Sequence, residues 1–231
     1  EEFSSSACYS VCGFSNKSSD MHRNSDSNSI CMVKPDTGTN KLRPKVRIFA
    51  DSHGRQIGPE LAKKANVNVF SVVKPNANFE CVTAESAAEK TNLGPNDLVV
   101  YMAGTNDVAR NDTHQLRTAL RKRLLEMRET IVLVFLVPQR YDLASWSCVN
   151  KEVEYANAEI RKTCKYFGNV ELSKIGSSFH TKHGLHLNSR GKNFVVDKII
   201  QKMSTITIGE KEQPIPIKIT FLVQNLNVIR P

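Results

Sequence analysis

VRIFADSHG, at residues 46–54, is the stretch that decides the fold. Its first five residues are apolar apart from one arginine, which predicts a short buried strand. The next four residues, DSHG, are typical of a tight turn. The predicted strand therefore ends at residue 50, and an aspartate, a serine and a histidine follow directly at its carboxyl end.

Similar segments recur along the chain and alternate in type. Short apolar runs predict further strands at residues 67–73, 97–103, 131–137 and 170–172. Between and after these runs, apolar residues recur every three or four positions, as on the buried face of a helix. These helical patterns cover residues 79–90, 113–129, 149–164 and 196–203.

This alternation predicts an α/β fold. Right-handed crossovers place helices on both sides of a parallel sheet, so strands that are apolar on both faces fit its interior. We therefore expect a three-layer α/β/α sandwich around a central, mostly parallel sheet of five strands. Ligands of such folds bind at the carboxyl ends of the strands.

The composition divides the chain into three parts. Residues 1–41 begin with ten serines among thirty residues and have few periodic apolar residues, so we expect a flexible leader. Residues 42–203 hold the regular pattern and form the predicted domain. In residues 204–231, apolar side chains alternate from Ile215 to Val223, which fits either an extra edge strand or an unrelated tail.

Charge and cysteine usage indicate the surroundings of this domain. Residues 42–203 hold 25 Lys and Arg against 16 Asp and Glu, so most of the net charge of +9 resides there and would attract RNA or another polyanion. The six cysteines are scattered, which indicates free thiols in a reducing compartment. We therefore expect an intracellular protein, cytoplasmic or nuclear. Its apolar runs are too short for a membrane span.

Four polar clusters follow the predicted strands. They are DSHGR at residues 51–55, KPNA at 74–77, GTND at 104–107 and HGLHLN at 183–188. Because the carboxyl ends of parallel strands lie at one edge of a sheet, we expect these clusters to meet there. A serine hydroxyl, an imidazole and a side-chain amide would then lie close together.

In order and position, these clusters resemble the four conserved sequence blocks of the SGNH (GDSL-like) hydrolase family. The resemblance covers about residues 45–203 and includes the segments DSHGR, VKP, AGTND and HGLHLN. It implies the flavodoxin-like fold of that family, which is a three-layer sandwich of the kind that the alternation predicts.

The resemblance implies a role for residues of each block. Ser52 matches the nucleophile and His186 the general base, since a serine hydroxyl is a weak nucleophile until an imidazole takes its proton. The backbone of Asn76, Gly104 and the side chain of Asn106 match the donors that hold the oxyanion of the tetrahedral intermediate. This chemistry requires no cofactor and no metal.

Three positions depart from the family pattern. Ala50 and Asn76 stand where the family has glycine. His183 occupies the third triad position, three residues before His186, where the family has an orienting aspartate. Without that carboxylate, His186 forms a dyad with Ser52, and another group must orient the imidazole.

The resemblance implies a carboxylic ester hydrolase that acts on a small ester with an acetyl or lipid acyl group. The same motifs also resemble the esterase-like domain in the first-open-reading-frame proteins of some non-LTR retrotransposons. That resemblance implies a retroelement origin. It also leaves a second function open, namely a catalytically weakened module of the same fold that binds RNA or DNA.

Five basic residues lie close together on the helix predicted at residues 113–129, and they have two interpretations. The simpler one is a solvated helix face, and the other is a contact with nucleic acid. The five are Arg117, Arg121, Lys122, Arg123 and Arg128.

Two groups of histidines and cysteines lack the spacing of a metal site, so we expect no metal there. They are Cys8, Cys12, His22 and Cys31 in the leader and His180, His183 and His186 before the last helix. Close to Ser52, His53 and Arg55 either line the substrate mouth or fix the turn. Asp107 or Asp112 fits the cap of a helix.

Overall fold

A computed structural model of the chain describes residues 29–32 and 43–209. Its strands form one six-stranded sheet in the order β1-β3-β2-β4-β5-β6. The strands β2 to β6 run parallel, as the sequence predicts, and β1 is antiparallel to β3. The strands span Ser29–Met32 (β1), Lys45–Ala50 (β2), Asn68–Val73 (β3), Leu98–Met102 (β4), Ile131–Phe135 (β5) and Val170–Ser173 (β6).

β1 lies within the segment expected to be a flexible leader, and here the structure differs from the sequence prediction. The four residues of β1 pair with residues 70–73 of β3. Three of its four residues, Ile30, Cys31 and Met32, are apolar, but the run is short and follows a serine-rich stretch, so the composition of the whole segment concealed it. The leader residues Cys8, Cys12 and His22 lie outside the described residues.

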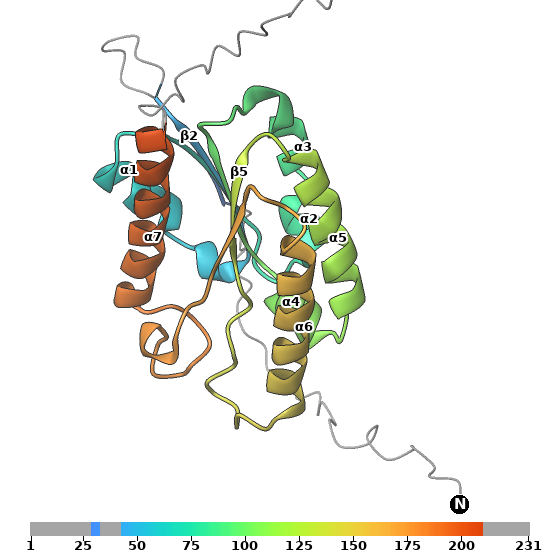
Figure 1. Ribbon diagram of the computed structural model, residues 1–231. Helices are drawn as coiled ribbons and strands as arrows, with labels where there is room; N and C mark the ends of the chain where they lie inside the picture. The colour runs from blue at the N-terminus through green and yellow to red at the C-terminus, as the bar shows by residue number, and fades with distance from the viewer. Residues whose placement is uncertain (1–28, 33–42, 210–231) are drawn as a thin grey trace, which may run out of the picture.

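Helices cover both faces of the sheet and produce the expected three-layer sandwich (Figure 1). α1 and α7 pack together on one face, and α2 to α6 lie on the other. The helices span Ile57–Lys64 (α1), Phe79–Thr83 (α2), Ser86–Glu89 (α3), Thr105–Ala109 (α4), Thr113–Glu126 (α5), Cys148–Cys164 (α6) and Ser189–Gly209 (α7).

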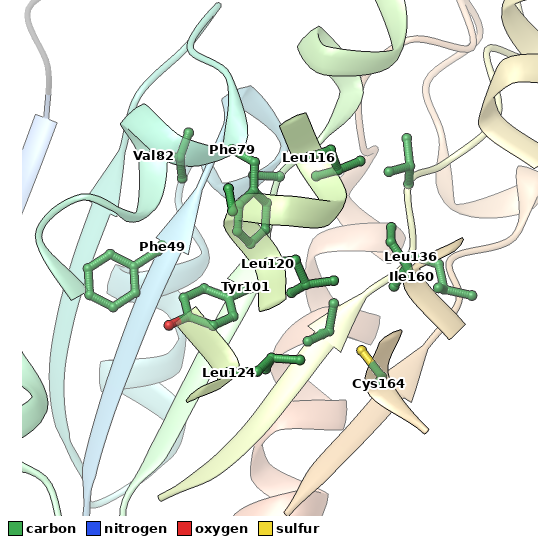
Figure 2. Close-up of a cluster of buried hydrophobic side chains, with 14 of the residues drawn as sticks. Phe49, Phe79, Val82, Tyr101, Leu116, Leu120, Leu124, Leu136, Ile160 and Cys164 are labelled. Carbon is green, nitrogen blue, oxygen red and sulfur yellow. The ribbon is translucent and has the colours of Figure 1, made fainter. Parts of the chain in front are cut away.

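Each face of the sheet packs into its own hydrophobic core. On the side of α5 and α6, the rings of Phe49 and Phe79 pack against Tyr101 with centroids 6.0 and 5.7 Å away (Figure 2). On the other side, strand residues such as Ile48 and Val100 pack beneath α1 and α7. All five residues of β4 are buried, which confirms that the central strands are apolar on both faces.

The helix predicted at residues 79–90 is interrupted in the structure. It consists of α2, α3 and the short 3-10 turn Lys90–Asn92. The Thr83 hydroxyl donates to the carbonyl of Phe79 at 2.8 Å, and the Ser86 hydroxyl donates to the carbonyl of Thr83 at 2.7 Å. Such side-chain bonds compete with the regular helical pattern, which apolar spacing alone does not reveal.

α7 extends past the domain end expected at residue 203 and reaches Gly209. The alternating segment at residues 215–223 lies outside the described residues. Within residues 43–209, no helix combines the length and the apolar character that crossing a bilayer requires.

Candidate active site

Ser52 follows β2 at the carboxyl edge of the sheet and opens the 3-10 turn Ser52–Gly54. The turn packs tightly on the end of its own strand, since a Cβ at Gly54 would lie 2.2 Å from the Cβ of Ala50. Alanine at position 50 is therefore accommodated by glycine at position 54. Ser52 is half-buried.

A buried ion pair flanks Ser52 on both sides in the sequence. Asp51 is 1% exposed and His53 is 5% exposed, and Asp51 Oδ1 lies 2.9 Å from His53 Nδ1. Burial by itself opposes both charges. The hydrogen bond and the mutual attraction outweigh it, so that the pKa of Asp51 is lowered and the pKa of His53 is raised. Of the two interpretations of His53, a lining of the substrate mouth or a fixing of the turn, the ion pair supports the second.

The same pair connects Ser52 to two other loops. The Thr105 hydroxyl, at the start of α4, donates to Asp51 Oδ2 at 2.6 Å. On the other side of the ring, His53 Nε2 lies 3.0 Å from the carbonyl oxygen of Leu185. The loops after β2 and β4 and the loop before α7 thus meet at one point, as the four-cluster pattern predicts.

His186 lies in the loop before α7, next to Leu185, and its side chain is exposed. Its ring centroid is 6.0 Å from that of His53. Partial burial and the nearby positive charges of His53 and Arg55 lower its pKa below the ordinary 6.5. The imidazole is therefore neutral at pH 7, as a general base must be.

The loop that carries His186 is shaped by Gly184. Its φ of +70° lies in the left-handed region, and a Cβ there would lie 2.4 Å from the backbone nitrogen of Asp142. Tyr141 N donates to Gly184 O at 3.3 Å, and Thr181 N donates to His186 O at 2.7 Å. The loop is thus packed against the segment after β5.

The third triad position has no contact that supports a role in catalysis. His183 is exposed, and within residues 43–209 neither His183 nor any carboxylate is hydrogen-bonded to the His186 ring. Over the same residues, the Ser52 hydroxyl is not hydrogen-bonded to His186 either. In many hydrolases this bond tightens only when substrate binds.

Asn106 and Asp107 connect the start of α4 to the segment after β3. The Asn106 side-chain amide donates to the carbonyl of Ala77 at 2.9 Å, and Asp107 Oδ2 accepts from the backbone N–H of Phe79 at 2.9 Å. Asp107 thus accepts from the first N–H of α2, whose N-cap is Asn78, and Asp112 makes no side-chain cap bond to α5. The bond to Ala77 fixes the direction of the Asn106 amide.

Asn76 and Gly104, the other expected oxyanion donors, both have left-handed backbone conformations. The φ of Asn76 is +61°, a value that asparagine tolerates better than most residues, so this position accepts asparagine as well as glycine. The φ of Gly104 is +124°, and a Cβ there would lie 2.9 Å from a methyl group of Val137. Gly104 is buried at this contact, so its evident role is to shape the loop.

A small cavity lies beneath the turn of Ser52. Asp51, His53 and Thr105 line it together with apolar residues, and its volume is about 10 Å³. That volume holds about one water molecule and no acyl chain. A substrate therefore does not fit inside this cavity.

A separate groove of about 1000 Å³, here called the α5–α6 groove, contains most of the basic cluster. Its basic lining residues are Lys90, Arg117, Arg121, Lys122, Arg128 and Lys162, and its acidic ones are Glu126 and Glu159. Tyr166, which also lines it, is 80% exposed.

Arg123 does not face this groove, contrary to its grouping with the other four basic residues. Its side chain is 4% exposed and forms ion pairs with Glu80 and Glu126. It also donates to the Thr83 hydroxyl at 3.2 Å. A helix with residues at 3.6 per turn places residue 123 on the core side, where it is neutralised and unavailable to a nucleic acid.

No protein-family model matches the sequence, and no curated protein resembles it significantly. Solved structures do resemble it in fold. A GDSL-like lipase from Bacteroides thetaiotaomicron superposes with a TM-score of 0.57 and 17% identity, over 70% of this chain and 88% of that one. The catalytic domain of a peptidoglycan O-acetyltransferase from Streptococcus pneumoniae superposes with a TM-score of 0.56 and 13% identity, over 73% of this chain and 97% of that one.

An acetylxylan esterase from Geobacillus stearothermophilus is similar to the same extent, with a TM-score of 0.54 and 12% identity, over 71% of this chain and 96% of that one. At such identities the likeness establishes the fold. The chain therefore has the α/β fold of the GDSL-like hydrolases, as predicted. The resemblance to retrotransposon proteins stays a prediction.

Proposed function

We propose that the protein is a serine esterase that hydrolyses small carboxylic esters, with Ser52 as nucleophile and His186 as general base. The observation that carries the proposal is the junction at His53, whose ring bonds to Asp51 beside Ser52 and to Leu185 beside His186. The fold shared with GDSL-like hydrolases supports it.

In the proposed reaction, Ser52 Oγ attacks the ester carbonyl carbon while the neutral His186 ring takes the hydroxyl proton. The negative charge then lies on the former carbonyl oxygen, where the Asn106 amide and the backbone N–H groups of Ser52 and Asn76 donate. Collapse of this intermediate releases the alcohol, which takes the proton from His186. The acyl group stays on Ser52 until water, deprotonated by the same ring, releases the acid.

We propose an acetyl ester as the preferred substrate. The cavity lined by Asp51 and His53, the neighbours of Ser52, holds about one water molecule, so a long acyl chain gains no buried surface there. Two of the similar structures are an acetylxylan esterase and a peptidoglycan O-acetyltransferase, which also handle acetyl groups.

The test compares the protein with Ser52→Ala on p-nitrophenyl acetate, butyrate and octanoate. We expect measurable hydrolysis that is fastest for acetate and absent in Ser52→Ala. Ser145→Ala, at an exposed loop serine, is the matched control and should retain the full rate. Equal rates for the protein and Ser52→Ala would refute the proposal.

A second candidate function is binding of single-stranded nucleic acid in the α5–α6 groove, and three unpaired cations favour it. Lys90, Arg121 and Arg128 line the groove and make no ion pair within residues 43–209. The exposed ring of Tyr166 lies among these charges. Cations that contact phosphates, together with an aromatic ring on which a base stacks, are typical of single-strand recognition.

Fluorescence anisotropy with labelled oligouridylate at increasing salt tests this candidate. We expect binding that weakens with salt, a smaller salt slope in Arg121→Glu/Arg128→Glu, and weaker binding in Tyr166→Ala. Lys198→Glu, on α7 in the opposite helix layer, is the control. An unchanged affinity in Tyr166→Ala would exclude stacking and indicate unspecific polyanion binding, and unchanged affinity in both groove variants would overturn the candidate.

A further inference from the structure

His53 joins the turn of Ser52 to the loop of His186 through both of its ring nitrogens. Nδ1 lies 2.9 Å from Asp51 Oδ1, and Nε2 lies 3.0 Å from the carbonyl oxygen of Leu185. Leu185 immediately precedes His186. The ring therefore fixes the backbone beside the proposed base relative to the strand end that carries the nucleophile.

These contacts require a proton on each nitrogen of the ring. A carbonyl oxygen only accepts, so Nε2 must donate. Asp51 Oδ1 accepts from the His53 backbone N–H at 3.0 Å and Oδ2 accepts from the Thr105 hydroxyl at 2.6 Å, which is the pattern of an ionised carboxylate. Nδ1 must then donate as well, and His53 is an imidazolium.

We infer that the Asp51–His53 ion pair is a protonation-dependent clamp that positions His186. While His53 carries both protons, the Leu185 carbonyl is held and His186 stays at the rim. When His53 loses its Nε2 proton, the nitrogen lone pair faces the carbonyl lone pair, and the loop is released. The kinetic consequence rests on the proposed esterase function, whereas the clamp itself does not.

The ionisable groups around His53 leave Asp51 as its nearest charged partner. His180 has its ring centroid 6.3 Å away, but burial and the charge of His53 lower its pKa, so it is neutral at pH 7. His186 is neutral as well. Asp107, on α4, lies close enough to Asp51 that the charge of Asp51 helps to raise the pKa of Asp107.

Both members of the clamp are charged over a defined pH range. The folded-state pKa of His53 lies above 6.5, so its stabilising contribution is complete below about pH 6.5 and is lost as pH rises through the folded value. The folded-state pKa of Asp51 lies below 3.8, so the carboxylate contributes above about pH 3.8 and loses that contribution as pH falls through the folded value. The clamp therefore opens at a pH above about 6.5, as pH rises through the folded-state pKa of His53.

The kinetic test is the pH dependence of kcat for p-nitrophenyl acetate. We expect a bell whose acidic limb reports His186 and whose alkaline limb reports His53. In Asp51→Asn the alkaline limb should move to lower pH, because a neutral amide no longer favours the imidazolium. In His53→Gln, kcat should fall about 10- to 100-fold with little change in KM, since misplacement of a catalytic group by about 1 Å costs roughly that factor. A limb that stays in place in Asp51→Asn overturns the inference.

A second measurement decides the clamp without turnover. Nuclear magnetic resonance of ring-¹³C-labelled histidines follows each imidazole ring as the pH is changed. The control variant is His114→Gln, at an exposed site on α5. We expect His53 to titrate above 6.5 and the His186 resonance to shift in parallel with it. The inference would be overturned if His53 titrated with a pKa at or below 6.5, or if the His186 resonance did not shift while His53 titrates. Absence of esterase activity with this coupling intact would refute the esterase alone.

Discussion

The side chain of Asp107 and the backbone of Phe79 are joined by a hydrogen bond of 2.9 Å, in which the carboxylate oxygen accepts. This bond ties the first residue of α2 to α4. Asp107 is 2% exposed, and burial raises its pKa to about 6. The arrangement needs an acceptor at this position but gains nothing from the charge.

Substitutions of Asp107 should separate the acceptor from the charge. Asp107→Asn keeps an oxygen for the Phe79 N–H, so we expect unchanged or slightly raised stability at pH 7. Asp107→Ala leaves that buried donor without a partner, which costs about 1–3 kcal/mol. Urea unfolding measures both variants. If Asp107→Asn and Asp107→Ala lost equal amounts of stability, the charge itself would matter.

The raised pKa of Asp107 also predicts how stability depends on pH. The folded protein binds a proton at this carboxyl up to about pH 6, whereas the unfolded chain releases it near 3.8. The contribution of Asp107 to stability therefore falls as pH rises between these values. Comparing the melting temperature of the protein with that of Asp107→Asn across this range should show a difference that grows toward pH 7. A constant difference would contradict the shift.

Asn106 provides the sharpest test of the proposed oxyanion site. In Asn106→Ala we expect kcat to fall about 10²- to 10³-fold, the usual cost of losing one such donor. The variant also loses the bond to the Ala77 carbonyl, so its melting temperature must be measured alongside the rate. A rate within tenfold of the original, in a protein that remains folded, would remove Asn106 from the site.

Ala50 and Gly54 should behave as a coupled pair. The Cβ of Gly54→Ala would lie 2.2 Å from the Ala50 Cβ, so we expect a loss of about 1–3 kcal/mol from overpacking. Because the φ of Gly54 is not positive, the clash rather than backbone strain causes that loss. Ala50→Gly combined with Gly54→Ala should recover much of it. If the double variant instead lost the sum of the stability losses of the two single variants, the contact between the two Cβ positions would be ruled out as the cause.

Much of the fold follows from local patterns in the sequence. The strand ends at Ala50 and Met102 lie within one residue of the predicted ends, because apolar runs stop where polar clusters begin. Those clusters also predicted that Ser52, Asn106 and His186 lie at one edge of the sheet. Side-chain pairing across the sheet was not predictable, since it depends on contacts far apart in the sequence.

His53 illustrates what sequence patterns omit. The spacing Asp51-Ser52-His53 allows an aspartate to cap a turn and reach the histidine ring, and this local signal was available. The contact with Leu185 joins positions 132 residues apart and has no local signal. Arg123 differs from its neighbours in the same way, because its partner Glu80 lies on another helix.

The central claim is that His186 activates Ser52, and labelling of Ser52 by a fluorophosphonate tests it most directly. The rate constant of labelling, located by mass spectrometry, should rise with pH through a pKa below 6.5 that belongs to His186. It should fall at least about 10²-fold in His186→Gln, the usual contribution of a general base. Labelling of Ser52 at the same rate in both proteins, or no labelling of Ser52 at any pH, would contradict the account.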